Sequence, residues 1–467
     1  MIRGTVDETP SNAGRGGSGR ARPLRILLIA YEFPPSPSPQ SLRWAYLGNR
    51  LAAMGHEIHV LAPDIGGSME GLPEAGPGVH VHRTWPGPIR ALLGFLARRR
   101  PAASVVAAAG TATSASGSGE TTAGLDLPPT AEPPRLNWKG RLLEHLQDAT
   151  SWLLFPDLRG EWERPARKAL HRLLDEVQPD VVVSSHEPAT TLRLGLEAKR
   201  RGFRWVADLG DPVLAGYTPR RWRGRAASLE AAVVREADHV LVTAVQALEL
   251  FRERYGSVAR ATVVTQGFDE QFAGAGARIS APDPAAPLEL LYAGSFYSFR
   301  HPQALVEAVL AVPGIRLNIA SGNVPEWLAA AARKHAMQVR LLGRVPHRRL
   351  LALQREVHVL VNLANADPSQ VPGKFYEYLG AGRPVLHVLA GAGLDATGVL
   401  VGQLGRGWAC GGERESIAAE LARIADRHRR GELSVGLDLE PGPVAPWSWT
   451  ASARTAAVAL RDVVASA

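Results

Sequence analysis

A lysine and a glutamate stand one helical turn apart within residues 371–388. Pro372 and Gly373 precede the pair and predict a helix that starts at Lys374. A cation is disfavoured at a helix N-terminus, and the more stable ion-pair order places Glu before Lys. In one interpretation, Lys374 and the helix N-terminus hold an anion such as a diphosphate, while Glu377 accepts hydrogen bonds from a neighbouring diol. The alternative is an ordinary Lys–Glu pair on a helix surface.

The rest of this segment predicts the elements that would position the pair. Phe375, Tyr378 and Leu379 share one helical face and would pack inward. Gly382 would end the helix, and the apolar run up to Val388 predicts a buried strand. A glycine-rich loop is expected after that strand.

The segment resembles the donor-site signature of retaining GT-B glycosyltransferases of family 4. In that family a loop with glycine and lysine leads into the pattern E-Y/A-x-A-x-G-x-P-V. The resemblance implies two Rossmann-like domains that face each other across a cleft, with Gly373 in the donor site and Glu377 on the nucleotide ribose. A further Glu often stands eight residues earlier, close to the donor sugar, and Ser369 takes its place here.

Length, charge and cysteine content limit the class of protein. The 467 residues are enough for two or three domains, and the single cysteine, Cys410, excludes an internal disulfide and fits a reducing compartment. No apolar run is long enough to span a bilayer, and the N-terminus lacks a signal-peptide core. The net charge of +8 favours anionic surfaces. Without zinc-ligand spacing or an RNP motif, nucleic acid is not an expected partner, and the resemblance implies an anionic membrane face instead.

Alternating strand and helix patterns predict an α/β fold of two doubly wound sheets. The apolar run at 24–31, a helix at 41–54 and a strand at 57–63 open the first sheet. The predicted organisation is a disordered tail (1–22), an N-terminal acceptor domain (23–272) with a flexible low-complexity insertion (101–134), a linker (273–287), a C-terminal donor domain (288–440) and a C-terminal helix that crosses back to the first domain (441–467).

Four polar residues of the N-terminal half are candidates for the cleft, His186 as a catalytic residue and the others on the acceptor side. His186 ends a predicted strand, where ligands of open α/β sheets bind. It matches a family position that lies beside the donor sugar, although a loop histidine bonded to backbone would look the same. Arg43, in the first turn of the first helix, could face the cleft or solvent. Asp208 and Asp211 resemble a family V-x-D-x-R-D-P segment, or they simply start a turn.

In the C-terminal half, the first strand leads into a segment that the family uses for the donor diphosphate. There the family has an Arg and a Lys on the phosphates, and this chain has Ser295 and Arg300. Arg300 would bind phosphate in a bidentate manner, and Ser295 could donate one hydrogen bond. Gly294 and Gly343 end strands and are expected near the nucleotide, although glycine is common at strand ends for turn reasons.

Together these features predict a metal-independent, retaining glycosyltransferase that uses a nucleotide diphosphate sugar as co-substrate and no cofactor. No Asp-x-Asp metal motif is present. Lys374 and Arg300 would stabilise the leaving diphosphate, and His186 would position the sugar or its acceptor. The resemblance implies a glycan or lipid-linked acceptor, a role in cell-surface polysaccharide or glycoconjugate synthesis, and a location in the cytoplasm or at the inner membrane face.

Two alternatives stay open from the sequence. One is a catalytically silent GT-B protein that binds or scaffolds, which Ser295 and Ser369 favour. The other is a nucleotide-sugar epimerase of the same fold. A nicotinamide dehydrogenase is disfavoured, because neither domain has G-x-G-x-x-G after its first strand.

Overall fold

The computed structural model describes residues 22–67, 69–91, 158–216, 218–256, 258, 260–273, 286–296, 302–365, 371–391 and 393–466. The predicted tail, apart from Arg22, and the predicted insertion at 101–134 lie outside the described residues. Within the described part of the chain, no helix is both long and apolar enough to cross a bilayer.

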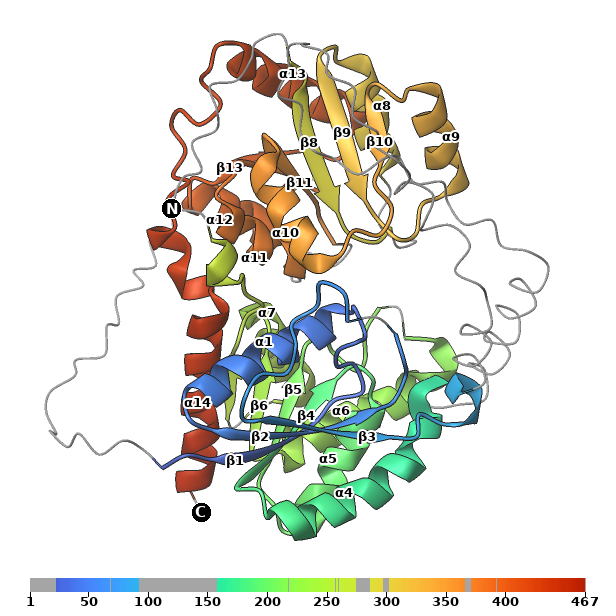
Figure 1. Cartoon of the computed structure of the whole chain (residues 1–467), viewed down its shortest axis with the longest axis vertical. Helices are drawn as coiled ribbons and strands as arrows, with labels where there is room; N and C mark the ends of the chain where they lie inside the picture. Colours follow the sequence, from blue (N-terminus) through green and yellow to red (C-terminus); the bar gives the residue numbers. More distant parts are fainter. Residues whose placement is uncertain are drawn as a thin grey trace, which may run out of the picture.

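Two parallel sheets organise the molecule, one in each half (Figure 1). The first has the strand order β3-β2-β1-β4-β5-β6-β7 and the second the order β10-β9-β8-β11-β12-β13. The strands of the first sheet are β1 (Arg25–Ile29), β2 (Glu57–Pro63), β3 (Val79–Thr84), β4 (Val181–His186), β5 (Trp205–Leu209), β6 (His239–Val242) and β7 (Ala261–Val263). Those of the second are β8 (Leu288–Ala293), β9 (Ile315–Ala320), β10 (Val339–Leu341), β11 (Val359–Leu363), β12 (Val385–Val388) and β13 (Gly407–Cys410).

Helices connect the strands and cover the sheets. Those of the N-terminal half are α1 (Pro39–Ala53), α4 (Glu163–Val177), α5 (Thr190–Arg200), α6 (Arg223–Glu236) and α7 (Val245–Tyr255), with short 3₁₀ turns η1 (Leu158–Trp162), η2 (Arg220–Trp222) and η3 (Glu270–Phe272). Those of the C-terminal half are α8 (Gln303–Ala311), α9 (Glu326–Lys334), α10 (His347–Glu356), α11 (Gly373–Ala381), α12 (Ala396–Gln403) and α13 (Arg414–Arg429). The chain ends with η4 (Gly442–Trp447) and α14 (Trp449–Ala465).

In each sheet the strand order reverses beside the first strand. In the first sheet β1 lies between β2 and β4, and in the second β8 lies between β9 and β11. Because ligands of open parallel sheets bind outside the carboxyl ends of the strands at this reversal, the exits of β1 and β4 and those of β8 and β11 are the expected binding regions.

The last helix returns to the N-terminal half, as predicted (Figure 1). Ser448 caps α14 by accepting a hydrogen bond from Ala451 N at 3.1 Å. Ala453 and Leu460 of α14 are buried in the same apolar cluster as Ile26 and Leu28 of β1. Packing against the N-terminal sheet therefore holds α14 in place.

The fold class is confirmed, and so are most of the predicted elements. The strand at 57–63 has the predicted bounds, and α11 runs from Gly373 to Ala381. Gly382 ends α11 with a left-handed φ of 66°, a conformation that glycine adopts without strain. The glycine-rich loop expected after Val388 is wrong in part, since it contains α12, which Asp395 caps.

Candidate functional site

The predicted Lys–Glu pair forms in the first two turns of α11. Lys374 Nζ donates to both carboxylate oxygens of Glu377, at 2.9 and 2.8 Å, and the two side chains are 29% and 13% exposed. Gln354 of α10 donates a further hydrogen bond to Glu377 Oε2 at 3.1 Å. Burial alone would raise the pKa of Glu377, but Lys374 and these hydrogen bonds outweigh it and hold that pKa below its ordinary value. Glu377 is therefore a charged acceptor at neutral pH.

The start of α11 lies against the N-terminal half of the molecule. A Cβ atom added to Gly373 would lie 3.6 Å from Cγ of Gln266, which follows β7. Among the described residues no side chain caps α11, and its first turn contains no acidic residue. The first amide groups of a helix without a cap point outward with a partial positive charge. Lys374 thus stands at the junction of the two halves, beside a helix end that favours an anion.

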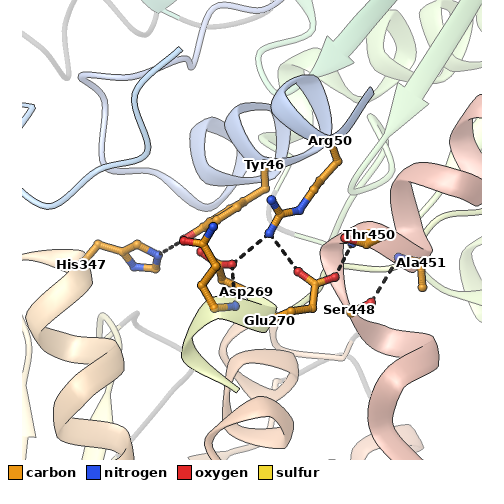
Figure 2. Close-up of polar contacts among 9 residues, drawn as sticks. Tyr46, Arg50, Asp269, Glu270, His347, Ser448, Thr450 and Ala451 are labelled. Atoms are coloured by element: carbon orange, nitrogen blue, oxygen red, sulfur yellow. Dashed lines mark hydrogen bonds and ion pairs between the residues drawn. The ribbon is translucent and has the colours of Figure 1, made fainter. Parts of the chain in front are cut away.

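A hydrogen bond across the junction lies close to this pair. The hydroxyl of Tyr46, on α1, is 3.0 Å from Nε2 of His347, the first residue of α10 (Figure 2). Burial lowers the pKa of His347 to about 4, with Lys374 adding to the effect and Glu377 opposing it. The imidazole is therefore neutral at physiological pH. Burial, together with the carboxylates of Asp269 and Glu377, raises the pKa of Tyr46.

Arg50 of α1 links the segment that follows β7 to the start of α14. Its Nη2 atom lies 3.0 Å from Asp269 Oδ1 and 2.9 Å from Glu270 Oε2 (Figure 2). The other oxygen of Glu270 accepts a hydrogen bond from Thr450 N at 2.8 Å. The segment that leaves the N-terminal sheet therefore has a fixed position relative to α1 and α14.

The candidate pair Arg43 and Asp208 requires a correction. Both side chains are fully buried, and Arg43 donates from Nε and Nη2 to the carboxylate of Asp208 at 3.1 and 2.9 Å. Trp44 Nε1 donates to the same carboxylate at 2.7 Å, and Arg43 Nη1 donates to the carbonyl oxygen of Thr265 at 3.1 Å. Each group is enclosed and engaged by the other, so neither faces solvent, and Arg43 lies close enough to Tyr376 of α11 to act on its pKa.

His186 stays at the end of β4, beside the exit of β1. It is 4% exposed. The backbone of Pro188 lies close enough to bond to the imidazole, so the alternative of a loop histidine bonded to backbone is retained. Burial lowers the pKa of His186, against the opposing effect of nearby carboxylates such as Glu187. Asp211 is half-buried, two residues after the end of β5.

The donor-side candidates after β8 are described only in part. Gly294 and Ser295 are half-buried at the exit of β8, and Gly343 adopts a φ of 67° after β10. Arg300 and Ser369 lie outside the described residues. Asn323, which the sequence analysis did not single out, holds the loop after β8. It accepts a hydrogen bond from Phe296 N at 3.1 Å and donates one to Phe296 O at 2.7 Å.

The comparisons with known proteins agree with this architecture. The family model of Glycosyltransferase Family 4 matches residues 126–272. This match covers 147 of the 467 residues, and it lies in the opposite half from the α11 segment that indicated the same family. The resemblance to family 4 is therefore confirmed from a second part of the chain. No curated protein sequence matches the chain.

Solved structures with similar folds align with 94–96% of the chain. Sucrose-phosphate synthase from Thermosynechococcus elongatus gives a TM-score of 0.65 at 16% identity, over 95% of this chain and 100% of that one. Anabaena HepE in complex with UDP-glucose gives 0.59 at 12% identity, over 94% and 100%. A protein assigned as a UDP-N-acetylglucosamine 2-epimerase from Listeria monocytogenes gives 0.54 at 11% identity, over 96% and 98%. At these identities the likeness concerns the fold, which is GT-B.

Proposed function

We propose that this protein is a glycosyltransferase that moves a sugar from a nucleotide diphosphate sugar to a glycan or lipid-linked acceptor, with retention and without a metal ion. The observation that carries the proposal is the start of α11. There Lys374, the N-terminus of α11 and the charged Glu377 lie together against the N-terminal half. The family match and the fold support the same class of enzyme.

The α11 geometry suits a nucleotide diphosphate with little rearrangement. The Lys374 side chain is 29% exposed, so its ammonium group can turn from Glu377 toward a ligand. A diphosphate would then replace the carboxylate beside Lys374 and gain the helix amides. The carboxylate of Glu377, still held by Gln354, would accept hydrogen bonds from the ribose hydroxyl groups.

The chemistry expected of this chain is electrostatic. Negative charge grows on the diphosphate as its bond to the sugar breaks, and fixed cations and amides stabilise that charge without reorganising. Lys374 and Arg300 are assigned to this task, with Gly373, Gly294, Ser295, Gly343 and Ser369 around the donor. His186 would position the sugar or its acceptor.

The domain bounds, the biological role and the location in the cell are part of the same proposal. We keep the domain bounds 23–272 and 288–440, and a role in cell-surface polysaccharide or glycoconjugate synthesis in the cytoplasm or at the inner membrane face. The net charge of +8 supports a peripheral contact with an anionic membrane. HepE, a similar structure, was solved with UDP-glucose, which makes UDP-sugars the first donors to test.

The test begins with thermal shifts of the full-length protein across UDP-, GDP- and TDP-sugars, because a ligand that binds only the native state raises its stability. The donor found in this way then enters turnover assays with Lys374→Ala and Glu377→Ala. We expect each variant to lose roughly 10- to 100-fold in kcat/KM, the equivalent of about 1–3 kcal/mol for a charge-assisted hydrogen bond. Matched controls are Lys334→Ala and Glu307→Ala, which remove exposed residues of the same half.

The outcomes separate the alternatives. Rates that stay at the wild-type level in both α11 variants would show that the site is elsewhere. Donor binding without hydrolysis or transfer would identify a catalytically silent protein. A changed sugar that forms without an acceptor would identify an epimerase.

A further inference from the structure

A loop of the N-terminal half binds the start of α10, which belongs to the opposite half of the molecule. The amide of Arg348, in the first turn of α10, donates a hydrogen bond to the carbonyl oxygen of Gly71 at 3.2 Å. Gly71 belongs to the loop between β2 and β3. No side chain in the described part of the chain caps α10. A backbone carbonyl of the N-terminal half therefore satisfies one of the amides that a helix cannot satisfy itself.

Two features of position 71 favour glycine. Its φ of 74° lies in the left-handed region, where other residues are strained. A Cβ atom at this position would lie 3.0 Å from the backbone nitrogen of His347 and 3.0 Å from Cβ of Pro346. The loop is also anchored in its own half, because Leu72 is buried in the apolar cluster that contains residues of β1 and α14. The contact with α10 is therefore both close and firmly supported.

A second contact reaches the same helix end from α1. The hydroxyl of Tyr46 lies 3.0 Å from Nε2 of His347, the first residue of α10 (Figure 2). The Tyr46 ring stacks on the ring of Trp449 of α14, with 5.3 Å between the centroids and 8° between the planes. Tyr46 and His347 are both buried. The N-terminal half thus holds the start of α10 at two places, one through a backbone carbonyl and one through a fixed aromatic side chain.

The same helix holds the donor pair. Gln354 follows His347 by about two helical turns, so both side chains project from the same face of α10. Gln354 is buried and donates a hydrogen bond to Glu377 Oε2 at 3.1 Å. Leu353 of α10 and Phe375 of α11 are fully buried in one apolar cluster. Because packed elements transmit displacement, a shift of the start of α10 would move the carboxamide that holds Glu377.

We propose that Gly71 and Tyr46 are positioning residues for the donor, and that they act through α10 to place the carboxylate of Glu377 for the nucleotide. The inference rests on the proposed function in assigning the nucleotide to Glu377. It adds that donor affinity depends on two residues of the N-terminal half. Neither residue is assigned a contact with the substrate.

The first experiment needs no nucleotide and therefore stands apart from the test of Lys374. Hydrogen–deuterium exchange of the full-length protein is followed by mass spectrometry in peptides that cover α10 and the strands of both sheets. We expect Gly71→Ala to speed exchange in the first turn of α10 roughly two- to tenfold, the range for one neutral hydrogen bond, and to leave the strands unchanged. Gly55→Ala is the matched control, because its φ of 94° brings comparable backbone strain while its added Cβ meets nothing within 4 Å.

The second experiment measures nucleotide affinity by titration calorimetry with UDP, GDP and TDP. Tyr46→Phe keeps the ring on Trp449 and removes only the hydroxyl group. We expect Gly71→Ala and Tyr46→Phe each to weaken nucleotide binding roughly two- to tenfold, and Gly55→Ala to bind as the wild type does. Because both residues act through Glu377, neither substitution should weaken binding further in a Glu377→Ala background, whereas unrelated losses of stability would add.

Three results would overturn the inference: wild-type exchange of α10 in Gly71→Ala, full additivity of both substitutions with Glu377→Ala, or weaker binding in Tyr46→Phe alone, which would show that Tyr46 touches the ligand directly. If Gly71→Ala also speeds exchange in the strands, its effect is global and Tyr46→Phe decides. Wild-type affinity of that variant then refutes the positioning role. The proposed function fails by a different signature, in which no nucleotide binds the wild type although exchange in α10 still responds to Gly71→Ala.

Discussion

Removal of either member of the Arg43–Asp208 pair should destabilise the N-terminal half of the molecule. Both side chains are 0% exposed, and two hydrogen bonds join the guanidinium to the carboxylate. The pair links α1 to β5. The additional hydrogen bond from Arg43 to the carbonyl oxygen of Thr265 links α1 to the segment that follows β7. A single substitution would leave the other charge buried without its counter-ion.

The structure sets the expected magnitudes. Arg43→Met leaves the carboxylate of Asp208 with Trp44 as its remaining side-chain donor, and breaking a buried pair in this way costs about 3–5 kcal/mol. Asp208→Asn leaves the guanidinium buried and should cost a similar amount. The double variant has no buried charge, and its main loss is the donor to Thr265 O, about 1–3 kcal/mol. The double variant should therefore be clearly more stable than the sum of the two single losses implies.

Urea unfolding, followed by circular dichroism and tryptophan fluorescence, measures these differences, and both probes are needed because the two halves can unfold separately. Arg333→Met is the matched control, because it breaks a pair with Glu326 in which the two side chains are 59% and 79% exposed. We expect that control to change stability little. The reasoning would be refuted if Arg43→Met and Asp208→Asn kept wild-type stability but abolished transfer, since the pair would then contact substrate.

Three further predictions concern other parts of the structure. Burial lowers the pKa of His347 from 6.5 to about 4. Between these two pH values the unfolded chain binds a proton that the folded chain does not. The free energy of unfolding should therefore fall by about 3 kcal/mol as the pH drops from 6.5 to 4. His347→Gln should flatten that decline in urea titrations at stepped pH. Gly380→Ala should cost about 1–3 kcal/mol, because its Cβ would lie 2.5 Å from Cγ of the Phe268 ring, whereas Gly48→Ala should not destabilise. Burial raises the pKa of the Cys410 thiol to about 12, so iodoacetamide should label it far more slowly in the native than in the unfolded chain.

Local sequence signals were sufficient for most of the secondary structure. The strand at 57–63 has the bounds that its apolar pattern predicts, since the period of that pattern and the residues that interrupt it are adjacent in sequence. β3 was missed because its sequence VHVHRT lacks an apolar face, and none of its residues is fully buried. α12 was missed because glycines surround it, and its start depends on the cap by Asp395.

The site was harder to predict than the fold because its partners are distant in sequence. Lys374 and Glu377 are three residues apart, and their contact follows from helix geometry. Arg43 and Asp208 are 165 residues apart, so the sequence indicated polar residues near a cleft but not that each neutralises the other.

A short segment after β7 determines how the two halves of the site face each other. The backbone of Phe268 bonds to both sides of the α14 N-terminus, through Trp447 O at 3.2 Å and Trp449 N at 3.0 Å. The Phe268 ring packs in the same apolar cluster as Tyr378 and Leu379 of α11. The helix that carries Glu377 is thus fixed by the same residue that joins the N-terminal sheet to α14. Because packed contacts of this kind transmit displacement, the distance between the donor helix and His186 depends on this junction and not on the sequence of α11 alone.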